Sequence, residues 1–193
     1  TEIYTLSLYD ALPISIHDRL LTPHRLPQSG QLNLHEVLER VRSLILAEYR
    51  QGLVIRRDYD VSLPTIRGDK EQLIQAVLNI VRNAAQAVVG SAGGSGEIAL
   101  RTRVIRQVTL ARRRYRHALA LEINDNGPGI PEGLKERIFY PLVSGRDGGS
   151  GLGLTLAQSF VNQHHGIVHF ESVPGNTTFT ILLPVEETVN GKQ

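Results

Sequence analysis

Two glycine-rich stretches flank a short apolar and aromatic patch and could together hold a phosphorylated ligand. The first is DNGPG at 125–129, and the second is GGSGLGL at 148–154. Glycine lets the backbone approach a ligand closely but costs conformational entropy on folding, so such clusters indicate loops that wrap something. A predicted helix over 152–161 follows the second cluster, and backbone N–H groups at a helix N-terminus bind phosphate. The pattern predicts a nucleotide site.

A predicted helix over 70–89 carries two opposite stripes when residues are spaced at ~100°. The apolar stripe consists of Leu73, Val77, Ile80, Ala84 and Val88. The other consists of Gln72, Asn79, Asn83 and Gln86, with Arg82 beside it. Asparagine is a poorer helix former than the Glu or Lys of a solvated face, and amide oxygens suit Mg²⁺ that is also bound by phosphates. The stripe is either an exposed polar face or, together with the glycine loops, a magnesium–phosphate site.

Asp125 ends an alternating strand immediately before the first glycine loop. A carboxylate in this position can accept a hydrogen bond from an exocyclic amine such as adenine N6. It can equally open an Asx turn, for which Asp-Asn-Gly is well suited. Asp125 alone does not separate these two interpretations.

Composition excludes several classes of function. The chain has 193 residues, 41% apolar residues and no cysteine, which excludes disulfides and thiolate zinc sites and fits the cytoplasm. No apolar run approaches the ~18–20 residues of a membrane span, so no membrane partner is expected. Seven of the 21 basic residues lie within 101–116 without an intervening acid, so the net charge of +2 hides a local basic patch. No nucleic-acid motif accompanies the patch, and no nucleic-acid partner is expected.

The elements that must position these residues follow from periodicity and caps. Helices are expected at 33–49, 70–89 and 152–165, with Asn33 and Asp69 as N-caps of the first two. Strands are expected at 53–57, 97–110, 116–124, 167–171 and 178–183, with arginines 112–114 at the tip of a long hairpin. This order predicts an α+β fold, a two-layer sandwich in which about three helices cover one face of a mixed, mostly antiparallel sheet.

Taken together and in order, these motifs resemble those of a known family. NIVRNA at 79–84, DNGPG, Phe139 and GGSGLGL resemble the N, G1, F and G2 boxes of the histidine-kinase ATP-binding domain, one of the GHKL (Bergerat-fold) ATPases. Residues 175–179, followed by Leu-Leu-Pro, resemble the last glycine box. RNAAQA, the arginine hairpin and FYPLVSGRDGGSGLGL further resemble nitrogen-regulation sensor kinases of the NtrB type.

The resemblance implies a role for each matching residue. Asn83 would coordinate Mg²⁺, Asn79 and Arg82 would lie near the phosphates, and Arg146 would reach the γ-phosphate from the lid. Asp125 would accept from adenine N6, with Thr177 beside it. The remaining implied nucleotide contacts are Gly127, Gly129, Ile130, Phe139, Gly149, Ser150, Gly151, Leu152, Gly153 and Leu154.

The implied activity is binding of Mg·ATP and transfer of its γ-phosphoryl group to a histidine on a dimerisation domain, for relay to an NtrC-type response regulator. The resemblance also implies a PII signalling protein as a partner and a homodimeric parent. Residues 1–16 are expected to be a disordered or artefactual leader, 17–32 the remnant of the dimerisation helix with a linker, 33–186 the catalytic domain and 187–193 a tail. The chain, which lacks methionine even at position 1, is expected to be a fragment.

The chain departs from the family pattern at two points. Asn176 stands where the last box usually has a second glycine, which predicts a tighter loop. The phosphoacceptor box is missing, because His35-Glu36 is followed by no Asn or Pro; His35 is expected to be a surface histidine. His164 and His165 end a helix, where positive charge is favourable.

Alternatives remain. The arginine hairpin is either a charged ribbon protected from edge pairing or a partner surface. The chain could be another GHKL enzyme, such as an anti-sigma serine kinase or a gyrase- or chaperone-type ATPase, or a binding module without catalysis. A short lid, and Asn79 in place of an activating Glu, disfavour the long-lid ATPases.

Overall fold

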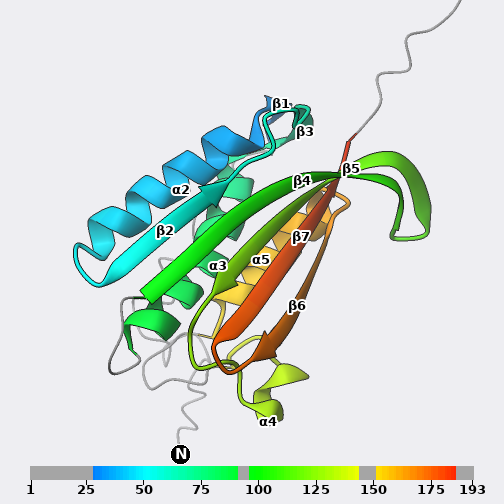
Figure 1. Cartoon of the computed structure of the whole chain (residues 1–193). Helices are drawn as coiled ribbons and strands as arrows, with labels where there is room; N and C mark the ends of the chain where they lie inside the picture. The colour runs from blue at the N-terminus through cyan, green and yellow to red at the C-terminus, as the bar shows by residue number, and fades with distance from the viewer. Residues whose placement is uncertain (1–27, 91–95, 144–150, 186–193) are drawn as a thin grey trace, which may run out of the picture.

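A five-stranded sheet forms one layer of the structure, a computed structural model that describes residues 28–90, 96–143 and 151–185 (Figure 1). In spatial order its strands are β2 (Leu53–Asp58), β4 (Gly96–Leu110), β5 (Arg113–Asp125), β7 (Asn176–Pro184) and β6 (Ile167–Val173). β2 and β4 are parallel, and the other neighbours are antiparallel. The predicted mixed, mostly antiparallel sheet is confirmed.

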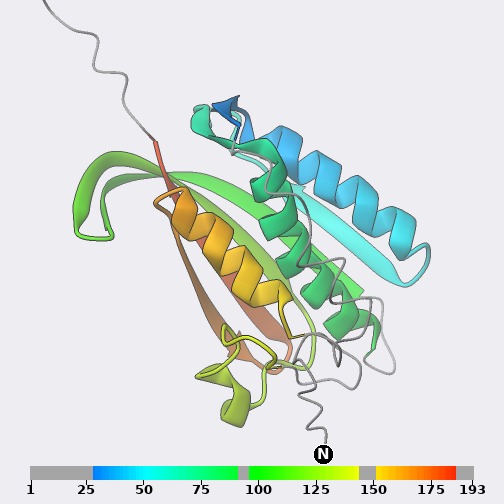
Figure 2. The same cartoon turned by 180° about the vertical axis from the view of Figure 1, so that it is seen from behind.

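Three helices form the second layer and cover one face of this sheet (Figures 1 and 2). They are α2 (Leu34–Glu48), α3 (Lys70–Val89) and α5 (Gly153–Gln163); α4 (Glu132–Lys135) is a single turn that the sequence did not predict. Asn33 and Asp69 are the N-caps of α2 and α3, and each carboxyl or amide oxygen accepts from backbone N–H groups of the first turn. In the part of the chain that the structure describes, none of the helices is long and apolar enough to cross a membrane.

The core lies between these two layers. Every member of the predicted apolar stripe of α3 is buried. β4 and β7 bury alternate residues over most of their length, and β5 does so after a run of four buried residues at 118–121. This is the arrangement that a period near 3.6 in the helix and a period of two in the strands require. The largest fully buried side chains include Leu38, Ile45, Ile80, Leu100 and Leu121.

A second, two-stranded sheet was not predicted. β1 (Ser29–Leu32) pairs antiparallel with β3 (Ile66–Asp69), whereas the sequence assigned 29–32 to the linker and predicted no strand at 66–69. Each strand has four residues, which is too short to show a period of two. Their pairing depends on a contact across more than 30 positions of sequence, so no local pattern predicts it.

The β4–β5 hairpin extends beyond its neighbouring strands (Figures 1 and 2). β2 pairs with β4 only as far as Arg101, and β7 pairs with β5 only from Ala118 onward. The turn at the tip places Ala111 and Arg112 at φ values of 46° and 67°, a conformation that Asn or Gly adopts more easily. The expected position of the arginines 112–114 at the tip is confirmed.

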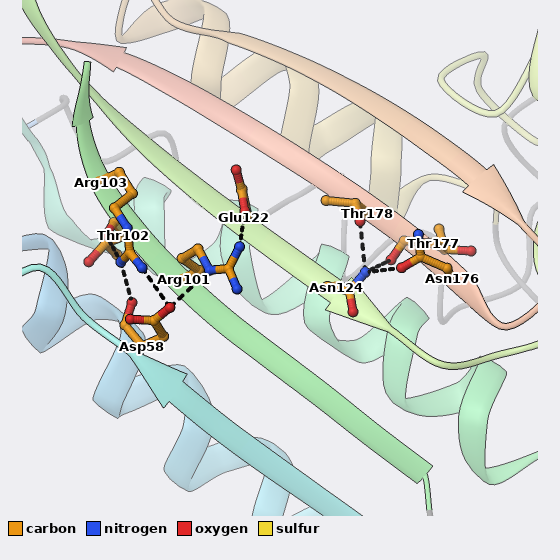
Figure 3. A network of polar contacts seen from close by, with 9 residues as sticks. All are labelled: Asp58, Arg101, Thr102, Arg103, Glu122, Asn124, Asn176, Thr177 and Thr178. Atoms are coloured by element: carbon orange, nitrogen blue, oxygen red, sulfur yellow. Dashed lines mark hydrogen bonds and ion pairs between the residues drawn. The ribbon is translucent and has the colours of Figure 1, made fainter. Parts of the chain in front are cut away.

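An ion-pair network joins β2 to the root of this hairpin on the open face of the sheet (Figure 3). Oδ2 of Asp58 accepts from Nη2 of Arg103 at 2.6 Å and from Nε of Arg101 at 2.9 Å, and Arg101 also contacts Glu122. The hydrogen bond from Arg103 is the main reason why the pKa of Asp58 lies below its usual value. Because the four side chains are well exposed, we assign this network a role in strand order rather than in stability.

Two histidines differ from their predicted settings. His35, expected at the surface, is half-buried: its ring stacks on Tyr59 with centroids 4.7 Å apart, and Nε2 lies 3.0 Å from Oγ1 of the fully buried Thr102. Burial lowers the pKa of His35, against the opposing effect of Asp60 and Glu39. Neighbours from another part of the chain therefore cover a position that the helical pattern alone places on the polar side.

His164 is not a simple cation at a helix end. Its Nε2 accepts from the backbone N–H of Asp69 at 2.8 Å, and its Nδ1 lies 2.7 Å from the carbonyl oxygen of Phe160. Since an N–H can only donate and a carbonyl can only accept, this geometry selects the neutral ring with its proton on Nδ1. His164 thus joins the end of α5 to the start of α3.

Candidate functional site

The elements that carry the described site residues meet at the end of the molecule where β5 ends, β6 turns into β7, and α5 begins (Figures 1 and 2). α3 runs toward this end and α5 runs away from it, so the second half of α3 and the first turn of α5 lie side by side there. The glycine loops and the amide stripe, far apart in sequence, are therefore brought together.

A row of three buried polar residues crosses the sheet at this end. Asp125 on β5 is paired in register with Thr177 on β7, and Thr177 with Ser172 on β6. Their exposed fractions are 3%, 4% and 8%. Buried polar groups are costly unless they bond to one another or to a ligand. A polar row on the core face of an otherwise apolar sheet thus indicates a binding floor.

The two glycines of the DNGPG loop are required for different reasons. Gly127 donates its N–H to Oδ1 of Asp125 at 2.9 Å, and a Cβ atom added to Gly127 would lie 2.7 Å from that oxygen. Gly129 has φ of +86°, and an added Cβ would lie 3.0–3.1 Å from the backbone of Val173 and Pro174. The first glycine leaves room for the carboxylate, and the second gives the turn its left-handed residue.

The Asx-turn interpretation of Asp125 is confirmed by this hydrogen bond. The same carboxylate that holds Gly127 is buried at the head of the polar row. The turn fixes the carboxylate in place, which is what a base-recognition group needs.

The β6–β7 turn is tied to this loop and to β5. The Gly175 N–H donates to the carbonyl oxygen of Gly127 at 2.8 Å. Nδ2 of Asn124 donates to Oδ1 of Asn176 at 2.6 Å and to Oγ1 of Thr178 at 2.7 Å (Figure 3). Asn176, predicted to tighten the loop as a replacement for glycine, is not among the residues with positive φ, and its side chain instead anchors the turn to β5.

The F-box residue Phe139 packs beside the floor. Its ring contacts Phe170 and Phe179 edge-on, with centroids 6.0 Å and 6.4 Å away, and its carbonyl oxygen accepts from Thr155 on α5 at 3.0 Å. Ile130 is half-buried and packs on the same core. These contacts join the segment after the first glycine loop to the start of α5.

Asn79 is more deeply buried than a residue on an exposed amide stripe would be. Only 9% of the residue is exposed because α5 packs over it, so the stripe is not a solvated face at this position. Its Oδ1 accepts from Gln75 at 3.0 Å, while its buried Nδ2 has no hydrogen-bond partner among the described residues. A buried amide without a partner points to a ligand, because such groups are otherwise satisfied. Gly153, the first residue of α5, lies directly above, with an added Cβ 3.8 Å from Asn79.

Asn83 and Arg82 lie one turn further along α3. The Asn83 amide is half-buried and makes no hydrogen bond within the described residues. Nε of Arg82 donates to Oε2 of Glu48 on α2 at 3.1 Å, which directs the guanidinium toward α2. The phosphate role predicted for Arg82 requires that this half-exposed ion pair open.

The second glycine loop is described only at its end. Gly151 has φ of +64°, its carbonyl accepts from the Leu142 N–H at 3.1 Å, and an added Cβ would lie 2.5–2.7 Å from the Leu142 and Val143 backbone. Leu152 is the N-cap residue of α5, and Leu154 is half-buried against the core. Arg146, Gly149 and Ser150 lie outside the described residues.

The residues present fit Mg·ATP. The site offers a buried carboxylate as an acceptor, a buried amide N–H₂ as an unused donor, and the free amide of Asn83 one helical turn away. In the described part of the chain, no three His, Cys, Asp or Glu side chains gather as metal ligands would. This suits a magnesium ion that takes most of its ligands from phosphate and water and one or two from protein.

Comparison with known proteins places the chain in a family. Residues 68–187 match the model of the histidine kinase-, DNA gyrase B- and HSP90-like ATPases. Since this match covers more than half of the chain, the protein belongs to that family of ATPases.

Within the family, the chain is similar to sensory histidine kinase/phosphatase NtrB proteins. It is 50% identical to that of Vibrio alginolyticus over 87% of this chain and 47% of the relative. It is 48% identical to the protein of Klebsiella oxytoca over 88% of this chain and 48% of the relative. It is 42% identical to the protein of Rhodobacter capsulatus over 83% of this chain and 45% of the relative. The chain thus spans about half the length of these relatives.

Solved structures agree on the fold. The catalytic domain of histidine kinase ThkA matches with a TM-score of 0.66 over 81% of this chain and 95% of that domain, at 23% identity. The mycobacterial sensor histidine kinase MprB matches with a TM-score of 0.63 over 82% and 97%, at 24% identity. At this level of identity the likeness concerns the fold alone.

Two residues near the site, Ser172 and Lys135, were not predicted from the sequence. Oγ of Ser172 accepts from the Ile130 N–H at 2.8 Å and lies 2.8 Å from Oγ1 of Thr177. Nζ of Lys135 donates to the carbonyl oxygen of Ser172 at 2.9 Å. Neither belongs to a glycine or asparagine motif. The register of β6 on β7 reveals Ser172, and the contact of α4 with β6 reveals Lys135.

Proposed function

We propose that this chain is the catalytic and ATP-binding part of a sensor histidine kinase of the NtrB type. It binds Mg·ATP and delivers the γ-phosphoryl group to a histidine on a dimerisation domain. The observation that carries the proposal is the buried row headed by Asp125, beside an amide donor without a partner at Asn79. The similarity to NtrB proteins at 42–50% identity favours a kinase over the other GHKL enzymes and over a binding module.

The residues suit phosphoryl transfer, which depends on positioning and charge neutralisation rather than on an acid–base pair. Asp125 accepts from the exocyclic amine of the base, Asn83 holds Mg²⁺, and Asn79 donates toward the phosphates. Arg146 supplies a positive charge from the lid. The bound ion, when present, offsets charge that develops on the transferring phosphoryl group.

The histidine acceptor lies on a partner domain, and an exposed apolar patch next to the site suits such a partner. Tyr140 and Leu142 are 59% and 73% exposed, and Leu156 on α5 is 38% exposed. Gly151, hydrogen-bonded to Leu142, leads directly into α5, so the patch lies beside the phosphate end of the site. Exposed large apolar side chains that gather in one place mark interaction sites.

The similar proteins suggest which partners receive the phosphoryl group or regulate its transfer. ThkA has been solved in complex with a response regulator, TrrA. For this chain we propose an NtrC-type response regulator as the final phosphoryl acceptor, and a PII signalling protein as a regulator. The arginine hairpin, which projects from the sheet and carries exposed Arg112, Arg113 and Arg114, is the surface that we assign to a regulatory partner.

The first test is nucleotide binding by Asp125→Asn. An amide at this position loses the charge that accepts from the base amine, so ATP affinity should fall about tenfold or more, since hydrogen bonds to charged groups contribute ~1.5–3 kcal/mol. Asp60→Asn, at a turn on another part of the molecule, is the matched control and should bind ATP normally. Undiminished affinity in Asp125→Asn, measured by calorimetry, would contradict the assignment of the adenine site.

A further inference from the structure

Ser172 connects three parts of the proposed adenine floor. Its hydroxyl accepts from the Ile130 N–H, its carbonyl oxygen accepts from Lys135, and the hydroxyl lies 2.8 Å from that of Thr177. Two of these bonds join β6 to the segment after DNGPG, and the third joins β6 to β7. The side chain is 8% exposed, so its bonds are made out of water.

The proton of the Ser172 hydroxyl has one available acceptor, the hydroxyl oxygen of Thr177. Its oxygen already accepts from a backbone N–H, which can only donate. If Thr177 donated to Ser172, the buried Ser172 proton would have no acceptor among the described residues. If Ser172 donates to Thr177, its proton has an acceptor while its oxygen still accepts from the Ile130 N–H. Because buried donors without acceptors are unfavourable, the second arrangement is selected.

That arrangement leaves Thr177 with its own proton directed away from Ser172. Thr177 is paired in register with Asp125, and the two side chains stand side by side on the same face of the sheet. The described residues give the Thr177 hydroxyl no partner besides Ser172. The row therefore presents an acceptor, the Asp125 carboxylate, next to a donor, the Thr177 hydroxyl.

We infer that Ser172 is a specificity-positioning residue: by donating to Thr177, it fixes Thr177 as a donor beside Asp125 and so matches the site to adenine rather than to a 6-oxopurine. Adenine presents an N6 amine donor next to the N1 acceptor. Guanine and hypoxanthine present the reverse, an O6 acceptor next to an N1–H donor. A bridging water preserves the same polarity, because it accepts from one neighbour and donates to the next. This inference rests on the proposed ATP-binding function.

The test compares the affinities for ATP and inosine triphosphate, measured by calorimetry. Ser172→Ala frees the Thr177 proton to turn toward the vacated side, so the preference for ATP over inosine triphosphate should fall roughly three- to tenfold, as expected for one hydrogen bond. Glu171→Ala, an exposed neighbour on the same strand, is the control and should keep the preference. Ser172→Cys, with a weak donor of similar size, should lower it in the same direction.

A double-mutant cycle separates this role from mere support of the loop. In a Thr177→Val background, Ser172→Ala should leave the ratio of the two affinities unchanged, because the group through which Ser172 acts is already gone. An equal loss of affinity for both nucleotides in Ser172→Ala, or no change in either, overturns the inference while leaving ATP binding intact. A wild-type chain that binds neither nucleotide overturns the proposed function itself.

Discussion

At the scale of single residues, the site needs glycines that let neighbouring atoms approach the backbone closely, as well as side chains with suitable chemical groups. Gly127 is a clear case, because its φ is not positive and any residue could adopt its conformation. What excludes a side chain there is the Asp125 carboxylate at 2.7 Å and the Ala87 Cβ at 3.2 Å from the position of an added Cβ. The glycine is needed for space.

Gly127→Ala should therefore displace the Asp125 carboxylate and lower ATP affinity about tenfold or more, the equivalent of ~1.4 kcal/mol. Gly133→Ala is the matched control, because an added Cβ at Gly133 meets nothing within 4 Å. Calorimetric titration of both variants with ATP measures the difference. Equal affinities in the two variants would show that the carboxylate tolerates the shift.

His35 should make stability depend on pH. Its pKa in the fold lies below the ordinary value of 6.5 because burial disfavours the charged ring. The unfolded chain then binds more protons than the folded chain between the two pKa values, so stability is fully present above about pH 6.5 and is lost as the pH falls below it. Urea unfolding from pH 7.5 to 5.5 should show a smaller loss in His35→Gln. Parallel curves for the two proteins would contradict this.

At the scale of elements, α3 and α5 are coupled at both ends. Near the site, Gly153 lies over Asn79, and at the far end His164 accepts from the Asp69 N–H that begins α3. The sequence predicted both helices and the caps Asn33 and Asp69, because these signals are local. It did not predict the coupling, because nothing in either helix specifies the other as its neighbour.

His164→Ala should destabilise the fold by about 1–3 kcal/mol, because it leaves the Asp69 N–H without an acceptor. The neighbouring His165→Gly is the control: His165 is exposed with φ of +57°, which glycine adopts freely, so stability should stay within about 1 kcal/mol of wild type. Chemical denaturation of the two variants measures both effects. A loss in His165→Gly as large as that in His164→Ala would refute the coupling.

At the scale of the whole molecule, the proposed phosphoryl transfer requires an acceptor histidine, and His35 does not suit that role. His35, in the first turn of α2, is stacked on Tyr59 and bonded to Thr102 on β4, so its ring is already engaged within the fold. The Tyr140–Leu142–Leu156 patch is where we expect the missing partner domain to dock.

We therefore expect no autophosphorylation when the chain is incubated alone with Mg²⁺ and labelled ATP. Addition of a separate NtrB-type dimerisation domain should restore labelling, on its own histidine. Label on His35 of the isolated chain would disprove the first statement. Failure of transfer to the added domain, despite normal ATP binding, would instead favour a binding module.

The sequence by itself determined the chemistry of the site. Glycines, asparagines and one aspartate within short contiguous segments predict loops, caps and an amide stripe, because those properties depend on neighbours within one or two turns. They also predicted the α+β class and the order of most elements.

Only the tertiary structure decided which of those groups are buried and what they bond. α5 covers Asn79, Glu48 holds Arg82, β1 pairs with β3, and the row at Asp125 continues through Thr177 to Ser172. Each of these depends on which strands and helices are neighbours and in which register they pair. Register is set by packing across long sequence separations, so a residue such as Ser172 acquires a role only once β6 lies against β7.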